Sequence, residues 1–273
     1  MDALIDTLKL LPYLLVTFLI LELLEHKLSK KSEKILSKNK KYGPILGGLL
    51  GALPQCGFSA MAANLFSSRV ITVGTLVAIF LSTSDEMLPI MISEQTDIVV
   101  LLKIIGFKII VGIIIGFIVD LLFKRKEEKN SISEICEHDH CHCESEGIII
   151  SSIKHTLKTA IFILIANLLI NIIIYYVGEE NLSNLLINKN ILTYFLASLI
   201  GLIPNCASSV IMTELYLSNL ITIGNLLSGL LTGSGLGILL LFRSNKDMKE
   251  NITILSIIYF VGVIIGILVD LFI

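Results

Sequence analysis

Charged residues are scarce in this sequence, and their scarcity excludes an ordinary water-soluble domain. Of the 273 residues only 16% are charged, whereas 54% are hydrophobic and the mean hydropathy is +0.86. A soluble domain of this size needs far more polar surface to stay dispersed. The net charge is only −2, so bulk electrostatics favour neither a nucleic acid nor another polyanion as a partner.

Several signatures of enzymes and secreted proteins are also missing. Nothing in the sequence resembles a nucleotide-binding loop or a flavin, haem or quinone site, so we expect no enzyme activity and no resident cofactor. The five cysteines do not suggest a disulfide scaffold. The first apolar stretch is not typical of a cleaved signal peptide, because residues 1–9 contain two acids and no small-residue cleavage site follows.

The sequence contains long uninterrupted apolar blocks instead. A helix needs about 20 apolar residues to cross roughly 30 Å of hydrocarbon. Blocks of this kind occupy residues 8–26, 70–92, 98–123, 155–177, 220–242 and 251–272. Lipid offers no hydrogen-bond partner to the backbone, so these blocks must be helices. We therefore predict an all-α, multi-pass protein of the inner or plasma membrane.

An internal repeat divides the chain into two similar parts. GALPQCGFS at 51–59 matches GLIPNCASS at 201–209, and GIIIGFIVDL at 112–121 matches GVIIGILVDL at 262–271. Matching non-aliphatic positions carry more weight than aliphatic ones in such a composition; they include Pro54/Pro204, Cys56/Cys206, Gly74/Gly224, Ser84/Ser234 and Asp120/Asp270. We predict a first transmembrane repeat at 1–123, a linker at 124–150 and a second repeat at 151–273.

The distribution of basic residues predicts that the two repeats have opposite orientations. Segment 27–41 carries seven lysines and one glutamate, whereas its counterpart 178–190 has two glutamates and one lysine. Segment 243–250 carries three basic residues and its counterpart 93–97 carries none. Because cytoplasmic loops are enriched in Lys and Arg, we place 27–41, Arg69, 124–150 and 243–250 in the cytoplasm.

Two further apolar segments, 43–67 and 191–218, are broken in the middle by Pro54 and Pro204. Each arm of the first has about 11 residues, which reach only about 17 Å as a helix. We therefore predict re-entrant hairpins that enter from opposite faces, with full crossings as the alternative. Freed backbone groups at such hairpin tips can face a cavity near the midplane.

Polar residues at membrane depth are costly, so they are candidates for ion binding. The span 70–92 is interrupted by Ser-Thr-Ser-Asp-Glu at 82–86, and the second repeat has Thr-Gly-Ser-Gly at 232–235. The candidate ligands at these interruptions and at the hairpin tips are Gln55, Cys56, Ser84, Asp85, Glu86, Asn205, Cys206 and Ser234. Carboxylates suit hard cations and thiolates suit soft ones, although both cysteines can equally be packing residues.

Other polar and small residues of the spans have structural explanations. Helix packing through small residues accounts for the repeated glycines, which are Gly112, Gly116, Gly262 and Gly266. We interpret Asp120 and Asp270 as anchors near the ends of equivalent spans. Lys103 and Lys108 can extend toward the outer surface, or Lys108 can be a counter-ion for one of the carboxylates at 85–86.

The linker 124–150 contains a dense group of metal-binding residue types. Within nine positions it holds Cys136, His138, His140, Cys141, His142 and Cys143 together with several acids. These are more ligands than one tetrahedral zinc site needs, and their spacing matches no zinc finger. We predict that the linker captures or senses a metal; a solvated acidic linker is the alternative.

The paired Pro-x-Cys tips, the inverted repeat and the His-rich linker resemble the prokaryotic ten-helix heavy-metal exporters, a family described both as arsenic efflux proteins and as manganese transporters. PQCG and PNCA also look like the Pro-x-Cys element of arsenical permeases. The resemblance covers nearly the whole chain and implies efflux of a metal or metalloid. Arsenite favours three thiolates, and only Cys56 and Cys206 lie in the membrane; manganese would use Asp85 and Glu86.

The expected function is therefore secondary-active export of a metal ion or metalloid, with protons as the coupling ion through Asp85 or Glu86. The expected partners are the lipid bilayer and the transported metal, and the sequence predicts no oligomeric state. Two rivals remain open. One is a permease for a small organic anion held by helix N-termini, and the other is a membrane thiol redox protein or sensor that cycles Cys56 and Cys206.

Overall fold

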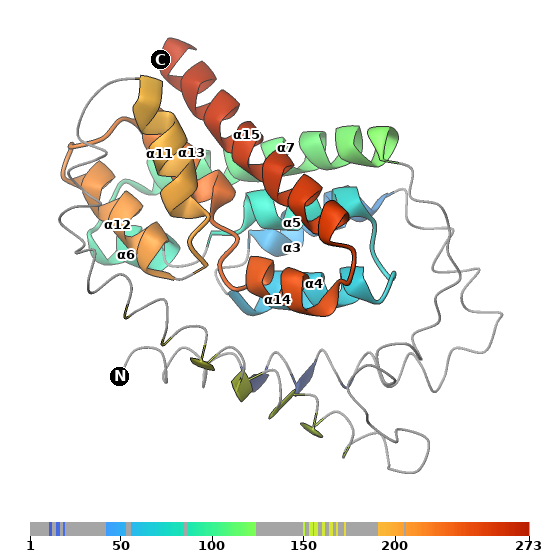
Figure 1. The fold of residues 1–273 in the computed structure, drawn as a ribbon. Coiled ribbons are helices and arrows are strands. Elements are labelled where there is room, and N and C mark those ends of the chain that lie inside the picture. The colour runs from blue at the N-terminus through green and yellow to red at the C-terminus, as the bar shows by residue number, and fades with distance from the viewer. Residues whose placement is uncertain are drawn as a thin grey trace.

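The computed structural model describes the chain continuously over residues 42–52, 56–84, 87–123, 191–204 and 206–272, together with isolated positions within 11–19 and 150–172. In these ranges the regular structure is helical, and they contain no strand (Figure 1). The linker 124–149 lies outside the described residues.

Ten helices in the described ranges fall into two sets of five. The first set is α3 (Gly43–Gly51), α4 (Cys56–Ser67), α5 (Val73–Ser82), α6 (Met87–Ser93) and α7 (Ile98–Leu122). The second set is α11 (Ile191–Gly201), α12 (Cys206–Leu217), α13 (Ile223–Thr232), α14 (Gly237–Ser244) and α15 (Met248–Phe272). The helices α12, α13 and α15 have the same lengths as α4, α5 and α7, respectively. Each of the helices α12 to α15 begins 150 residues after its counterpart in the first set.

Helices α7 and α15 are long and apolar enough to cross a membrane. Each has 25 residues and a mean hydropathy of 2.8 in its most apolar window, and the stretch Ile223–Ser244 also qualifies. On α7 an outward stripe at helical spacing is exposed, formed by Ile110, Ile114 and Ile118. Such a stripe is costly in water but is solvated by lipid tails. The chain is a multi-pass membrane protein.

The start of α5 and the start of α13 are held by the same set of hydrogen bonds. The hydroxyl of Thr72 caps α5 by accepting from Thr75 N (3.1 Å), and the carboxylate of Asp120 on α7 accepts from Thr72 Oγ1 (2.7 Å) and Gly74 N (2.7 Å). A carboxylate at a helix N-terminus satisfies amides that have no partner within the helix.

The second half repeats this arrangement. Thr222 caps α13 through Asn225 N (3.2 Å), and Asp270 on α15 accepts from Gly224 N (2.9 Å) and from the hydroxyl of Thr222. The two aspartates are thus the helix-end anchors that the sequence predicts, and each anchors a neighbouring helix to its own.

Glycines let α5 approach α7, and α13 approach α15, at the distance where backbones touch. A Cβ atom added to Gly116 would lie 2.6 Å from the carbonyl oxygen of Gly74, and one added to Gly266 would lie 2.5 Å from that of Gly224. Small residues at helix crossings are typical of membrane bundles. The predicted packing role of these glycines is confirmed.

The two halves interlock into one body. One core cluster joins α4, α5 and α7 of the first half to α14 and α15 of the second. The other joins α6 and the start of α7 to α11, α12 and α13. Consequently α14 lies along α4 and α6 lies beside α12 (Figure 1). Both of these clusters, in the ranges that the structure describes, are therefore built from residues of both halves.

Candidate ion site at the two helix breaks

Both halves contain a helix that stops in the interior and restarts after four residues. α5 ends at Ser82 and α6 begins at Met87, while α13 ends at Thr232 and α14 begins at Gly237. The predicted interruptions at 82–86 and 232–235 are therefore present. Local chemistry explains them, because Pro89 suits only the first turn of a helix and Gly235 adopts φ 53°, which favours glycine.

A lysine on α7 lies level with these breaks. Lys108 comes ten residues after the start of α7, which places it about 15 Å from one end of the helix and about 21 Å from the other at about 1.5 Å per residue. Its exposed fraction is 0%. Lys103, one and a half turns away, is exposed. The prediction that Lys103 extends outward is consistent with this, whereas that option is wrong for Lys108.

The ammonium group of Lys108 joins the ends of the two broken helices. Its Nζ donates to the carbonyl oxygen of Thr83, directly after α5, and to that of Leu230 in the last turn of α13 (2.8 Å). The last carbonyls of a helix lack partners within the helix and carry its partial negative charge. Helix ends from both halves thus supply acceptors for this buried ammonium group. The predicted pairing of Lys108 with a carboxylate at 85–86 falls outside the described residues.

Buried hydroxyl groups surround the same breaks. Ser84 is 1% exposed and its Oγ donates to Ser82 O (3.3 Å), whereas Thr83 Oγ1 donates back to Ile79 O (2.7 Å). Ser234 is 0% exposed and its Oγ has no hydrogen-bond partner among the described residues. A buried polar atom of this kind calls for an explanation, such as a water or an ion.

The structure describes only part of the predicted site. Ser84 and Ser234 lie at the breaks and are buried. Cys56 and Cys206 are the first residues of α4 and α12, and the positions of their thiols lie outside the description. The other predicted ligands also fall outside the described residues: Gln55, Asp85, Glu86, Asn205, Cys136, His138, His140, Cys141, His142 and Cys143. Within the described ranges no three His, Cys, Asp or Glu residues form a group that could hold a metal.

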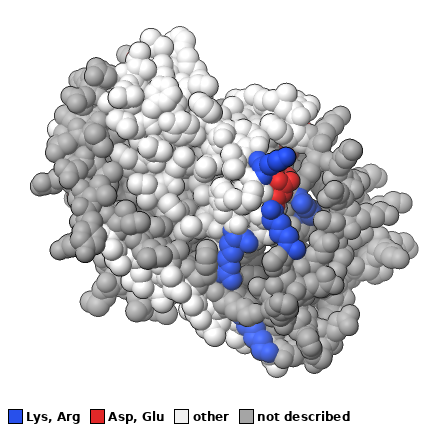
Figure 2. Space-filling view, in the orientation of Figure 1, with Lys and Arg blue, Asp and Glu red and all other residues white. Residues whose placement is uncertain are grey.

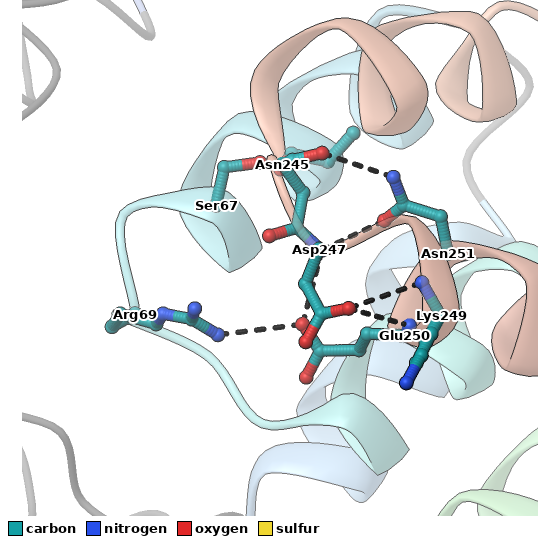
Figure 3. Close-up of polar contacts among 8 residues, drawn as sticks. Ser67, Arg69, Asn245, Asp247, Lys249, Glu250 and Asn251 are labelled. Carbon is teal, nitrogen blue, oxygen red and sulfur yellow. Dashed lines mark hydrogen bonds and ion pairs between the residues drawn. The ribbon is translucent and has the colours of Figure 1, made fainter.

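A second polar cluster, at one end of the molecule, ties the two halves together (Figure 3). Arg69, after α4, contacts Glu250 of α15, with 3.4 Å between Nη1 and Oε2. The side-chain amide of Asn245 donates both to Glu250 Oε2 (3.0 Å) and to Asn251 Oδ1 (2.7 Å). These contacts place residue 69 at the same end as segment 243–250, as the predicted topology requires.

Basic residues gather at this end. On the face drawn in Figure 2, most of the described surface is uncharged, one cluster of basic side chains surrounds an acidic patch, and further basic side chains lie apart from this cluster. Neither the Asn245–Asn251 pair nor the bridging role of Lys108 was predictable from the sequence. The only signal in the sequence was asymmetry, because the position equivalent to Lys108 is Ile258 and that equivalent to Glu250 is Val100.

Comparison with known families agrees with this architecture. A family model described as "Putative, 10TM heavy-metal exporter" matches residues 3–180 and 144–273, which together cover almost the whole chain. The comparison with curated proteins gives no match, and neither does the comparison with solved structures. The resemblance inferred from the Pro-x-Cys tips, the repeat and the linker is thereby confirmed. The chain belongs to the ten-transmembrane-helix heavy-metal exporter family.

Proposed function

We propose that this protein is a secondary-active transporter that exports a metal ion through a site formed at the two helix breaks. The observation that carries the proposal is the meeting of α5 and α13 at Lys108, where helix ends from both halves share one cation in the interior. In transporters built from repeats, unwound carbonyl groups and helix C-terminal ends at the midplane are the groups that hold cations.

The oxygen-rich surroundings favour a hard or borderline cation as cargo. Backbone carbonyls and the hydroxyls of Ser84 and Ser234 lie at the breaks, and Asp85 and Glu86 follow Ser84 directly in the chain. We propose these two carboxylates as metal ligands and as the groups that exchange protons. Oxygen ligands suit manganese better than arsenite, so manganese is the preferred cargo, with Cys56 and Cys206 as additional thiol ligands.

The proposed topology places the charged end in the cytoplasm. Arg69 and the basic segment 243–250 lie together at that end, and cytoplasmic loops are enriched in such residues. The matching helix starts at an offset of 150 residues support a duplicated unit. The proposal gives the two copies opposite orientations and lets them rock against each other to expose the site alternately. The linker 124–150 is then cytoplasmic, where its cysteines and histidines would collect metal before export.

The experiment that tests this proposal is metal export from a metal-hypersensitive bacterial strain. Cells that express the wild-type chain should hold less manganese, measured by mass spectrometry, than cells with an empty vector. We expect the substitution Asp85→Asn to abolish the difference while the protein still inserts in the membrane. Asp97→Asn is the matched control, because Asp97 is an exposed acid that caps α7. Export by Asp85→Asn at the wild-type rate contradicts the assignment.

One observation favours a second candidate, a permease for a small organic anion. A buried ammonium such as that of Lys108 can hold a carboxylate. This function predicts that Lys108→Met abolishes anion uptake or release, and that Asp85→Asn and Cys56→Ser leave it unchanged. The carbonyl ends around Lys108 repel an anion, which is why we rank metal export first. We propose no enzymatic role for the chain.

A further inference from the structure

We infer that Lys108 is a tethered competitor of the transported cation: its ammonium group occupies carbonyl ligands of the cation site while the transporter is empty, and cargo displaces it. The inference rests on the proposed function and names a residue that sets the affinity for cargo. The contacts of Lys108, the contrast with its counterpart in the other half, and the unpaired hydroxyl of Ser234 carry it.

The contacts of Lys108 are those that a cation ligand site would offer. The ammonium group has donors only and no acceptor, and it donates to the main-chain oxygens of Thr83 and Leu230. Both oxygens lie at the C-terminal end of an interrupted helix, α5 in the first half and α13 in the second. A metal ion that enters this place needs the same two oxygens. Lysine and cargo therefore cannot both be bound to them.

The counterpart in the second half shows that packing does not require this lysine. Ile258 takes the equivalent position on α15 and is also 0% exposed, within an apolar core. The helix pair α13 and α15 still crosses through Gly224 and Gly266, as α5 and α7 cross through their own glycines. A buried charge has a large desolvation cost, and an apolar residue serves the same structural purpose in the other half. The charge itself must therefore have a use.

The break after α13 also contains a buried hydroxyl group, that of Ser234. Ser234 follows Leu230 by four residues in the chain, beyond the end of α13, and its buried Oγ has no partner in the part of the chain that the structure describes. A hydroxyl oxygen can accept from Lys108 or bind a metal ion. The break thus contains a buried oxygen in addition to the two carbonyls that Lys108 contacts, as expected for a site that also accepts another cation.

Competition of this kind keeps a cation at the carbonyl ligands after the exporter has released its cargo. An empty cluster of helix carbonyl ends is poorly solvated at membrane depth. When the ammonium of Lys108 returns to these oxygens, the empty site regains a cation without a second ion from solution. The side chain suits this task, because lysine carries a compact charge on a flexible four-carbon stem.

The test uses the full-length protein in lipid nanodiscs with Mn²⁺ as the probe. Wild type, Lys108→Met and Lys108→Arg are compared by isothermal titration. We expect Lys108→Met to bind Mn²⁺ about ten-fold more tightly, equivalent to about 1.4 kcal/mol, and Lys108→Arg to stay near wild type because it keeps a competing cation. In parallel, acetylation of wild-type lysines is measured by mass spectrometry. Mn²⁺ should raise acetylation of Lys108 and leave that of the exposed Lys103 unchanged.

Each outcome shows whether Lys108 competes with the cargo or only links the two helices structurally. Unchanged or weaker Mn²⁺ binding by a folded Lys108→Met protein, or acetylation of Lys108 that ignores Mn²⁺, overturns the inference. If Lys108→Met does not fold, Lys108→Arg and the acetylation measurement on wild type decide. Absence of binding in every form also overturns it. Manganese export from cells then separates the two claims, because retained export leaves the proposed function standing and lost export removes both.

Discussion

The two halves of the molecule share a scaffold but not a charge pattern. The carboxylates of Asp120 and Asp270 hold the starts of α5 and α13 in the same way, and glycines make the same close crossings in both halves. In contrast, the buried Lys108 of α7 is matched by the buried Ile258 of α15. Residues that stabilise the fold are therefore the same in both halves, whereas the buried lysine occurs in only one of them.

The turn after α4 and the turn after α12 show the same contrast in more detail. Both turns use a left-handed residue, Arg69 with φ 63° and Asn219 with φ 57°. Asparagine tolerates this backbone conformation better than arginine. The first half keeps the less suitable residue at this corner, where its side chain contacts Glu250. The contact between α4 and α14 is also more extensive than that between α12 and α6, so the two ends of the molecule are unequal.

The largest effects are expected where the scaffold is most tightly duplicated. Gly74→Ala and Gly224→Ala should each destabilise the protein by about 2–3 kcal/mol or prevent folding, because the added Cβ meets a backbone carbonyl that cannot move away. The measurement is the melting temperature and the monodisperse fraction in detergent. Gly106→Ala is the control, since nothing lies within 4 Å of a Cβ at that position. A large loss for one glycine alone would break the structural equivalence of the halves.

The anchoring carboxylates should give a smaller and again equal effect. Asp120→Asn and Asp270→Asn each replace an acceptor that faces an N–H and an O–H donor, so we expect a loss of about 1–2 kcal/mol for each. The double variant should show the sum of the two losses. Thermal unfolding measures both, with Asp97→Asn as a control in which one good helix cap replaces another. Unequal losses would mean that Tyr194, which donates to Asp270 alone (2.8 Å), compensates in the second half.

The features that the sequence predicted correctly depend on short segments, and each of these segments occurs once in each half of the chain. Helix breaks follow from Gly, Pro and polar residues inside apolar spans, and Gly112 or Gly116 at helical spacing indicates a close crossing. Asp120 and Asp270 were predictable as anchors because each directly follows a long apolar run near the end of its span. In each case the chemistry of a short segment restricts its structure, and the second copy supplies independent support.

The contacts of Lys108 could not be predicted, because they depend on distant parts of the chain. One acceptor, Leu230, is 122 residues away, and the two partners of the Arg69–Glu250 contact are 181 residues apart. Hydropathy and spacing define the faces of α7 but not which helix covers each face. The sequence therefore left two options for Lys108. The gathering of Cys56 and Cys206 with the carboxylates at 85–86 stays a prediction.

The smallest expected effect tests whether charge or packing makes the two ends unequal. Arg69 and Glu250 are partly exposed, with side-chain exposures of 26% and 16%, so a double-mutant cycle with Arg69→Gln and Glu250→Gln should give a coupling of about 0.5–1 kcal/mol. Raising the salt concentration should reduce this coupling, because ions screen exposed charges. Asn219→Gln, at the equivalent corner, should lower thermal stability slightly, because glutamine suits the left-handed backbone less well than asparagine, and this loss should not depend on salt. A coupling that is insensitive to salt would show that the packing of α4 on α14, and not the Arg69–Glu250 ion pair, makes the two ends of the molecule unequal.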